Sequence, residues 1–134
     1  MTNLLVKNGA YNGVIIKTDK LRAKSLAETE LTLLCGVRMG HIIRSMASLG
    51  LGGMEGLAGI PGTVGGAVYM NAGAYGGEIV QICESVDVMY PDGSLVTIPG
   101  AEMGFSYRHS RLEEDGGIVV SATFALHEKP EQEV

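Results

Sequence analysis

The segment LAGIPGTVGGAVYMNAGAYGG, residues 57–77, carries no charged side chain and is rich in glycine and alanine. Glycine loses more conformational freedom on folding than any other residue, so this run indicates main chain that must approach something closely. Its length would suit a membrane-spanning helix, but Pro61, Asn71 and the frequent glycines disfavour one. Two interpretations remain: close packing inside a protein core, or a loop whose exposed N–H groups surround a polyanionic cofactor, which we favour.

The rest of the chain predicts an α+β domain. Apolar side chains at helical spacing between Met39 and Leu49 predict a helix that ends at a left-handed Gly50. The Pro-Asp-Gly sequence at 91–93 predicts the turn of a hairpin. Short apolar or alternating runs predict strands at residues 4–6, 14–16, 31–35, 82–90, 95–98 and 118–126.

Composition limits the possible functions. Of the 134 residues 46% are apolar, which supports a packed core, and the net charge of −5 disfavours nucleic acid and anionic membranes as partners. Cys35 and Cys83 lie far apart in the sequence and predict small buried thiols in a reducing cytosol. No signal peptide is visible, so a cytoplasmic location is expected. His41, His109 and His127 share no metal-ligand spacing, so no metal site is expected.

The glycine segment does not match the two commonest phosphate-binding loops. No Gly-Lys-Ser/Thr follows it, as a P-loop requires, and no G-x-G-x-x-G lies between a strand and a helix, as a Rossmann fold requires. A phosphate-binding role therefore belongs to another architecture.

Several motifs of the chain occur together in one known family. They are GIPGTVGGA at 59–67, MNAGAYG at 70–76, YPDG at 90–93, FSYRHS at 105–110 and, near the start, Asn3-Leu4-Leu5-Val6. Together they resemble the signature of UDP-N-acetylenolpyruvoylglucosamine reductases, the MurB-type flavoenzymes of peptidoglycan precursor synthesis. The resemblance spans about Asn3 to Leu126. It implies an incomplete FAD-binding domain of the vanillyl-alcohol-oxidase type at residues 1–127, with 128–134 as a tail or truncated linker.

The resemblance implies where FAD binds. In such proteins the glycine-rich loop passes along the pyrophosphate and the flavin, because two phosphates need convergent N–H donors that side chains would hold away. Pro61 would stiffen the start of the loop and lower the ordering cost on binding. The implied cofactor contacts are Asn3, Leu4, Gly59, Ile60, Pro61, Gly62, Thr63, Val64, Gly65, Gly66, Ala67, Asn71, Ala72 and Gly73.

The resemblance also implies a reaction. The family passes a hydride from NADPH to FAD and then to the enolpyruvyl group of a UDP-sugar, UDP-N-acetylglucosamine enolpyruvate, which gives UDP-N-acetylmuramate. Negative charge builds on the carboxylate side of the substrate, so a fixed cation favours the transition state. Arg108 is the implied catalytic and substrate-binding cation, with Tyr107 beside it at the flavin and substrate. Ser110 is expected to be structural, since the family's proton-donating serine belongs to a later motif.

That later Gly-Ser-x-Phe motif and the family's catalytic glutamate do not occur in this sequence. The resemblance therefore implies an excised domain or a truncated product that does not turn over substrate alone. We expect it to bind FAD weakly or not at all, and to expose apolar surface that favours self-association. Two alternatives stay open. One is another flavin oxidoreductase of the same fold, acting on lactones or aryl alcohols; the other is a non-catalytic remnant that serves as an interaction module.

Overall fold

The computed structural model describes residues 16–18, 20–57, 59–74 and 77–128. Within these residues an antiparallel sheet of five strands has the order β1-β2-β8-β6-β7, and two further ladders have two strands each. The strands of the sheet are β1 (Lys24–Ala27), β2 (Glu30–Leu34), β8 (Ile118–Ala125), β6 (Cys83–Met89) and β7 (Leu95–Pro99). The ladders pair β3 (Leu51–Gly52) with β9 (His127–Glu128) and β4 (Gly73–Ala74) with β5 (Gly77–Glu78).

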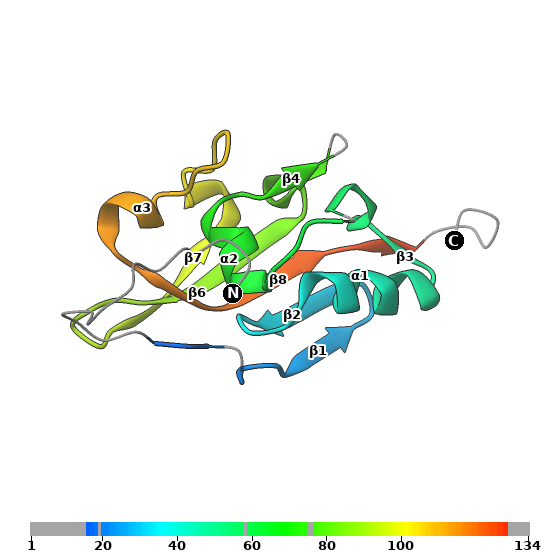
Figure 1. The fold of residues 1–134 in the computed structure, drawn as a ribbon, viewed down its shortest axis with the longest axis horizontal. Coiled ribbons are helices and arrows are strands. Elements are labelled where there is room, and N and C mark those ends of the chain that lie inside the picture. The colour runs from blue at the N-terminus through cyan, green and yellow to red at the C-terminus, as the bar shows by residue number, and fades with distance from the viewer. Residues whose placement is uncertain (1–15, 19, 58, 75–76, 129–134) are drawn as a thin grey trace, which may run out of the picture.

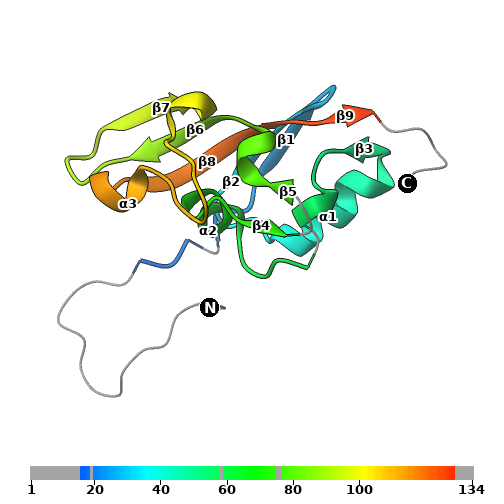
Figure 2. The same cartoon turned by 90° about the horizontal axis from the view of Figure 1, so that it is seen from above.

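The helices lie on one side of the sheet, as Figures 1 and 2 show from two directions. The α-helices are α1 (Met39–Ser48), α2 (Val64–Tyr69) and α3 (Leu112–Asp115). Short 3-10 helices occur at η1 (Glu55–Leu57), η2 (Ile79–Gln81) and η3 (Gly100–Glu102). In the described part of the chain, no helix has the length and apolar character needed to cross a membrane.

The core forms between this layer of helices and the inner face of the sheet. Leu31 of β2 lies opposite Phe124 of β8, and Leu33 lies opposite Ala122, so these two neighbouring strands present a continuous apolar surface. The helices contribute apolar side chains three and four residues apart, which places them on one face of each helix. The buried helix residues are Met39, Ile42 and Met46 of α1 and Val64, Ala67 and Val68 of α2.

The opposite face of the sheet is polar. The hydroxyls of Thr32 and Thr123 lie 3.0 Å apart, and the Asp87 carboxylate accepts hydrogen bonds from Thr97 (2.6 Å) and Ser121 (2.8 Å). An antiparallel sheet with one face on the core shows this alternation of apolar and polar side chains. Among the described elements, no α-helix covers this polar face (Figure 2).

Most of the predicted elements are confirmed. Strands β2, β6, β7 and β8 differ from the predicted ones only at their ends. Helix α1 ends as expected, because Leu49 is its C-cap and Gly50 follows with a φ of 74°. Gly93 has a φ of 88° in the turn between β6 and β7. The predicted strand at 4–6 and all but the last residue of that at 14–16 lie outside the described residues, and Ile16 belongs to no strand.

Two expectations need correction. The glycine segment is not a loop throughout, because its residues Val64–Tyr69 form helix α2. The buried residues Val64, Ala67 and Val68 pack against the sheet, and this packing outweighs the poor helix propensity of the glycines beside them. Glu128, which the sequence places in the tail, pairs with Leu51 between β9 and β3. Residues 129–134 lie outside the described part of the chain.

Candidate functional site

Main-chain hydrogen bonds hold the glycine segment beside the connection that leads from β2 to α1. They run from the Met39 amide to the Gly62 carbonyl (3.0 Å), from Val64 to Val37 (2.9 Å) and from Gly65 to Cys35 (2.9 Å). Between the first two of these bonds, Arg38 and Thr63 lie opposite each other as an antiparallel bridge. The segment therefore has a fixed place against the start of α1.

The amides of residues 59–67 fall into two groups. One group donates to carbonyl oxygens at 2.9–3.2 Å; its members are Ile60, Val64, Gly65 and Ala67. The second group donates to no atom of the described residues; its members are Gly59, Gly62, Thr63 and Gly66. Buried main-chain donors are almost always paired. The amides of the second group are therefore the ones left for solvent or a ligand.

The turn around Pro61 requires glycine on both sides. Gly59 has a φ of 88° and Gly62 a φ of 100°, which side chains disfavour. A Cβ built on Gly59 would meet no atom within 4 Å, so the main chain there is open to an approaching molecule. Gly59 and Pro61 are both exposed.

Gly65 and Gly66 face different surroundings. A Cβ on Gly65 would lie 2.9 Å from Cys35 Cβ and 3.3 Å from the Cys35 carbonyl oxygen. At Gly66 the nearest atom to such a Cβ would be Thr63 Oγ1, at 3.9 Å. Each of the two interpretations of the glycine segment therefore applies to a different residue. Gly65 permits close packing in the core, whereas Gly66 leaves the main chain accessible.

Asn71 joins three segments that are distant in sequence. Its side-chain amide donates to the Ser106 carbonyl (2.9 Å) and to Glu78 Oε2 (3.1 Å), and its Oδ1 accepts from the Val80 amide (3.0 Å). The residue is 2% exposed and has a φ of 46°. Both side-chain donors are thus used within the protein. A direct contact between these donors and a cofactor, as the motif suggests, would break one of these bonds.

The Ser106 bond fixes a turn that carries Tyr107 and Arg108. Ser106 and His109 exchange two main-chain hydrogen bonds of 3.1 Å, which leaves the two residues between them at the tip. Tyr107 is 82% exposed, and the Arg108 guanidinium lies 5.5 Å from the centre of its ring. Among the described carboxylates none pairs with Arg108. The turn therefore presents an exposed cation held against an aromatic face.

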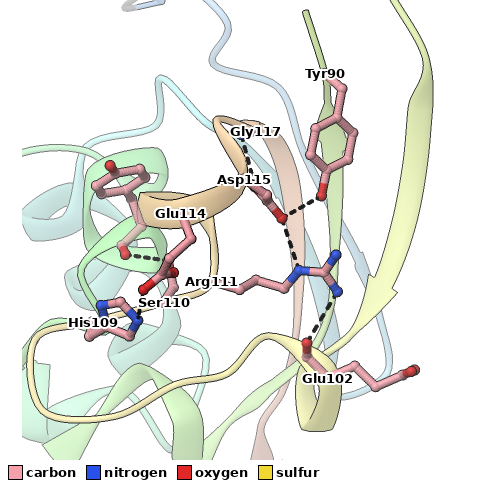
Figure 3. Close-up of polar contacts among 9 residues, drawn as sticks. Tyr90, Glu102, His109, Ser110, Arg111, Glu114, Asp115 and Gly117 are labelled. Carbon is pink, nitrogen blue, oxygen red and sulfur yellow. Dashed lines mark hydrogen bonds and ion pairs between the residues drawn. The ribbon is translucent and has the colours of Figure 1, made fainter.

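Buried and paired groups anchor the chain on the C-terminal side of this turn (Figure 3). Ser110 is fully buried, and its hydroxyl donates to the Tyr69 carbonyl at the end of α2 (2.5 Å). This confirms its structural role. The ring of His109 lies 2.9 Å from Glu113 Oε2 and 3.0 Å from Glu114 Oε1.

Asp115 is the centre of a second polar network, also drawn in Figure 3. Its carboxylate accepts hydrogen bonds from the Tyr90 hydroxyl (2.9 Å), Arg111 Nε (3.0 Å) and the Gly117 amide (3.0 Å). Burial raises the pKa of Asp115, but the bonds from Gly117, Tyr90 and Arg111 outweigh this effect and hold the pKa below its usual value. Burial and the bond to Asp115 raise the pKa of the Tyr90 hydroxyl. The network ties α3 to the end of β6.

This lowered pKa predicts a pH dependence. A carboxyl whose pKa is lower in the folded state stabilises the fold above its ordinary pKa of about 3.9. That contribution is lost as the pH falls through the folded value. We expect Asp115→Asn to lower the unfolding temperature at about pH 7, and the difference from the parent chain to shrink toward about pH 3. Thermal unfolding between about pH 3 and pH 7 measures this difference, and replacement of the exposed Glu84 (Glu84→Gln) is the control. A difference that stays constant with pH would argue against the network.

The two cysteines differ in burial. Cys35 is buried as predicted, whereas Cys83 is half-buried. Burial raises the pKa of the Cys83 thiol to about 12, so it stays protonated at neutral pH. Among the described residues, no three His, Cys, Asp or Glu side chains are grouped as a metal site would need.

Four other residues were predicted to contact the cofactor: Ala72, Gly73, Asn3 and Leu4. Ala72 lies directly after Asn71, and its amide donates to the Ala67 carbonyl (2.8 Å). Gly73 lies in β4. Asn3 and Leu4 lie outside the described residues. Sequence reasoning missed the position of Arg38 opposite Thr63, because no motif includes Arg38 and the contact depends on the fold.

Comparisons with known proteins bear on the family, the fold and the cofactor. A family model described as "FAD binding domain" matches residues 1–99. UDP-N-acetylenolpyruvoylglucosamine reductases of Lactobacillus helveticus (strain DPC 4571) and Streptococcus pyogenes serotype M1 are 42% and 45% identical over 125 residues, which cover 93% of this chain and 42% of theirs. The crystal structure of the reductase MurB from Thermus caldophilus superposes with a TM-score of 0.71 at 41% identity, over 76% of this chain and 38% of that chain.

These similarities confirm three predictions: the resemblance to these reductases, the α+β fold of an FAD-binding domain, and FAD as the cofactor. The chain spans about 42% of the length of the curated relatives that it matches.

Proposed function

Because this chain belongs to the FAD binding domain family, we propose that its residues 1–127 form the flavin-binding part of a reductase of peptidoglycan precursor synthesis. The reaction is the reduction of UDP-N-acetylglucosamine enolpyruvate to UDP-N-acetylmuramate, with NADPH as the hydride donor. The proposal places the protein in the cytoplasm, without nucleic acid or membrane partners. It is carried by one observation: the main-chain donors of Gly59, Gly62, Thr63 and Gly66, on the segment that the motif assigns to the cofactor, have no partner among the described residues.

These donors suit the pyrophosphate of FAD. Phosphate oxygens accept several hydrogen bonds at once, and main-chain N–H groups in a concave turn supply them without a flexible side chain. The space beside Gly59 and Gly66 lets a ligand reach the main chain. The paired amides of Ile60, Val64, Gly65 and Ala67 shape the segment in this proposal and do not donate to the cofactor. FAD, when bound, supplies a redox centre that takes up a hydride and passes it on.

Arg108 acts on the substrate in this proposal. Its exposed guanidinium binds the carboxylate of the enolpyruvyl group and favours the negative charge that develops there. The main-chain bonds of the turn and the ring of Tyr107 limit its freedom, which lowers the entropic cost of binding. Asn71 positions this turn, and Asn3, Leu4, Ala72 and Gly73 complete the proposed cofactor contacts. Self-association through exposed apolar surface belongs to the same proposal.

The substitution Gly66→Ala tests the cofactor site. Alanine is the better helix former and meets open space at this position, so the free energy of unfolding should rise by about 0.5–1 kcal/mol. The added methyl group covers the exposed main chain, so FAD affinity should fall on the order of tenfold, about 1.4 kcal/mol. Urea unfolding and titration of flavin fluorescence measure the two effects.

The neighbouring substitution Gly65→Ala is the matched control. Its methyl group would lie 2.9 Å from Cys35 Cβ, so the fold should lose about 1–3 kcal/mol. Its FAD affinity, corrected for the folded fraction, should match that of the parent chain. The proposal commits to weak but saturable FAD binding by the parent chain. It fails if Gly66→Ala binds FAD as tightly as the parent, or if the parent shows no saturable binding even at high FAD concentration.

A further inference from the structure

Three basic side chains gather at the start of α1 without an acidic partner. Arg38 precedes the helix, and His41 and Arg44 are exposed on its first turns. Within the described residues, none of the three forms an ion pair or a side-chain hydrogen bond. The chain has 15 acidic residues and a net charge of −5, so three basic side chains without an ion pair to any described residue need an explanation.

The stability of α1 does not explain Arg38. The residue is the N-cap of the helix, and its side chain makes no capping hydrogen bond. Ser, Thr, Asp or Asn would stabilise this position by accepting a bond from a first-turn amide. A cation is also disfavoured at the positive end of the helix dipole, and the first turn of α1 holds no acidic residue to offset it.

The bridge to Thr63 places Arg38 beside the glycine segment. The hydrogen bonds beside this bridge run from the Met39 amide to the Gly62 carbonyl and from the Val64 amide to the Val37 carbonyl. Arg38 and Thr63 therefore form the kind of antiparallel pair whose two residues are not hydrogen-bonded to each other. In such a pair the two side chains point to the same side, with Cβ atoms about 4.5–5.5 Å apart. Thr63 Oγ1 in turn lies 3.9 Å from the position of a Cβ on Gly66. Arg38 therefore lies on the side where the Gly66 main chain is open.

We propose that Arg38 binds the pyrophosphate of FAD as a side-chain partner of the amides at residues 62–66. This inference rests on the proposed function. The amides fix where the phosphates lie, and Arg38 supplies a positive charge directly opposite Thr63. A guanidinium suits this task because its planar fork forms two charge-assisted hydrogen bonds with one phosphate.

The experiment is a titration of the full chain and of Arg38→Gln with FAD, ADP and riboflavin at low ionic strength. We expect the Kd for FAD and for ADP to rise on the order of tenfold in the variant, as for the loss of one charge-assisted bond. The effect should shrink with added salt, and binding of riboflavin, which has no phosphate, should not change. Arg44→Gln is the matched control, because it removes the same charge from α1 but Arg44 does not lie opposite Thr63. It should change the Kd by less than about twofold.

Each outcome bears on a separate claim. Equal losses in Arg38→Gln and Arg44→Gln would indicate a general charge effect and overturn the specific role of Arg38. An unchanged Kd in Arg38→Gln, with a parent chain that binds FAD, would overturn this inference and leave the proposed function standing. A parent chain that binds neither FAD nor ADP would overturn both. The Arg38 side chain caps no amide of α1, so Arg38→Gln should leave the fold intact. Thermal unfolding of each variant checks this.

Discussion

Replacing Asn71 with alanine is expected to lower the free energy of unfolding by about 3–5 kcal/mol. The substitution removes the hydrogen bonds that the Val80 amide, the Ser106 carbonyl and Glu78 form with Asn71, and leaves the Ser106 carbonyl with its bond from the His109 amide. A buried group that loses its partner costs about 1–3 kcal/mol. Alanine also disfavours the left-handed conformation that Asn71 adopts, with a φ of 46°, by about 1–2 kcal/mol.

Asn71→Gly separates the two contributions. Glycine accepts the left-handed conformation but removes the same side-chain bonds, so it should be the more stable variant by about 1 kcal/mol. Urea unfolding gives the energies. Hydrogen exchange at the Ser106 and His109 amides follows the turn itself, and it should become faster in both variants while the amides of β8 stay protected. If both variants were as stable as the parent chain, the three bonds would not hold these segments together.

The substitution Gly100→Ala should be almost as damaging, with an expected loss of about 3 kcal/mol. A Cβ on Gly100 would lie 2.1 Å from the Cys83 carbonyl oxygen and 3.4 Å from that of Glu84. Both are main-chain atoms of β6, which cannot rotate away as the end of a flexible side chain would. Either β6 or η3 must shift, and η3 leads into the segment that carries Arg108.

Gly66→Ala is the control for this prediction, since it adds the same methyl group where no atom lies closer than 3.9 Å. The midpoint and slope of urea unfolding separate a lost packing interaction from a change in cooperativity. A loss below about 1 kcal/mol for Gly100→Ala would mean that η3 can move off β6 at little cost.

The sequence predicted those parts of the fold that local patterns determine. The spacing of Met39, Ile42 and Met46 identifies α1, and Gly50 and Gly93 mark a helix end and a hairpin turn. Helix α2 was missed because Gly65 and Gly66 favour a loop locally, and tertiary burial of the neighbouring apolar residues decides the outcome. Strand β1 was missed because all four of its side chains are exposed and, of the strands that the structure describes, it pairs with β2 alone.

The sequence identifies the segments that form the candidate site, but not how their atoms are arranged in space. The motif identifies residues 59–67 and Arg108, yet it cannot show which amides are paired, because the pairing depends on contacts with residues 35–39. Asn71 illustrates the same limit, since its partners are Val80 and Ser106 from other parts of the chain. Such long-range contacts leave no periodic signal in one sequence.

The bond from Asn71 to Ser106 has a thermodynamic consequence for the two halves of the proposed site. It connects the end of α2, which begins inside the glycine segment, to the turn that carries Arg108. A ligand that reduces motion at one of these segments therefore lowers the entropy still to be lost at the other. By linkage the effect is reciprocal, so a dinucleotide held at Gly66 and a carboxylate held at Arg108 would each raise the affinity for the other by the same factor.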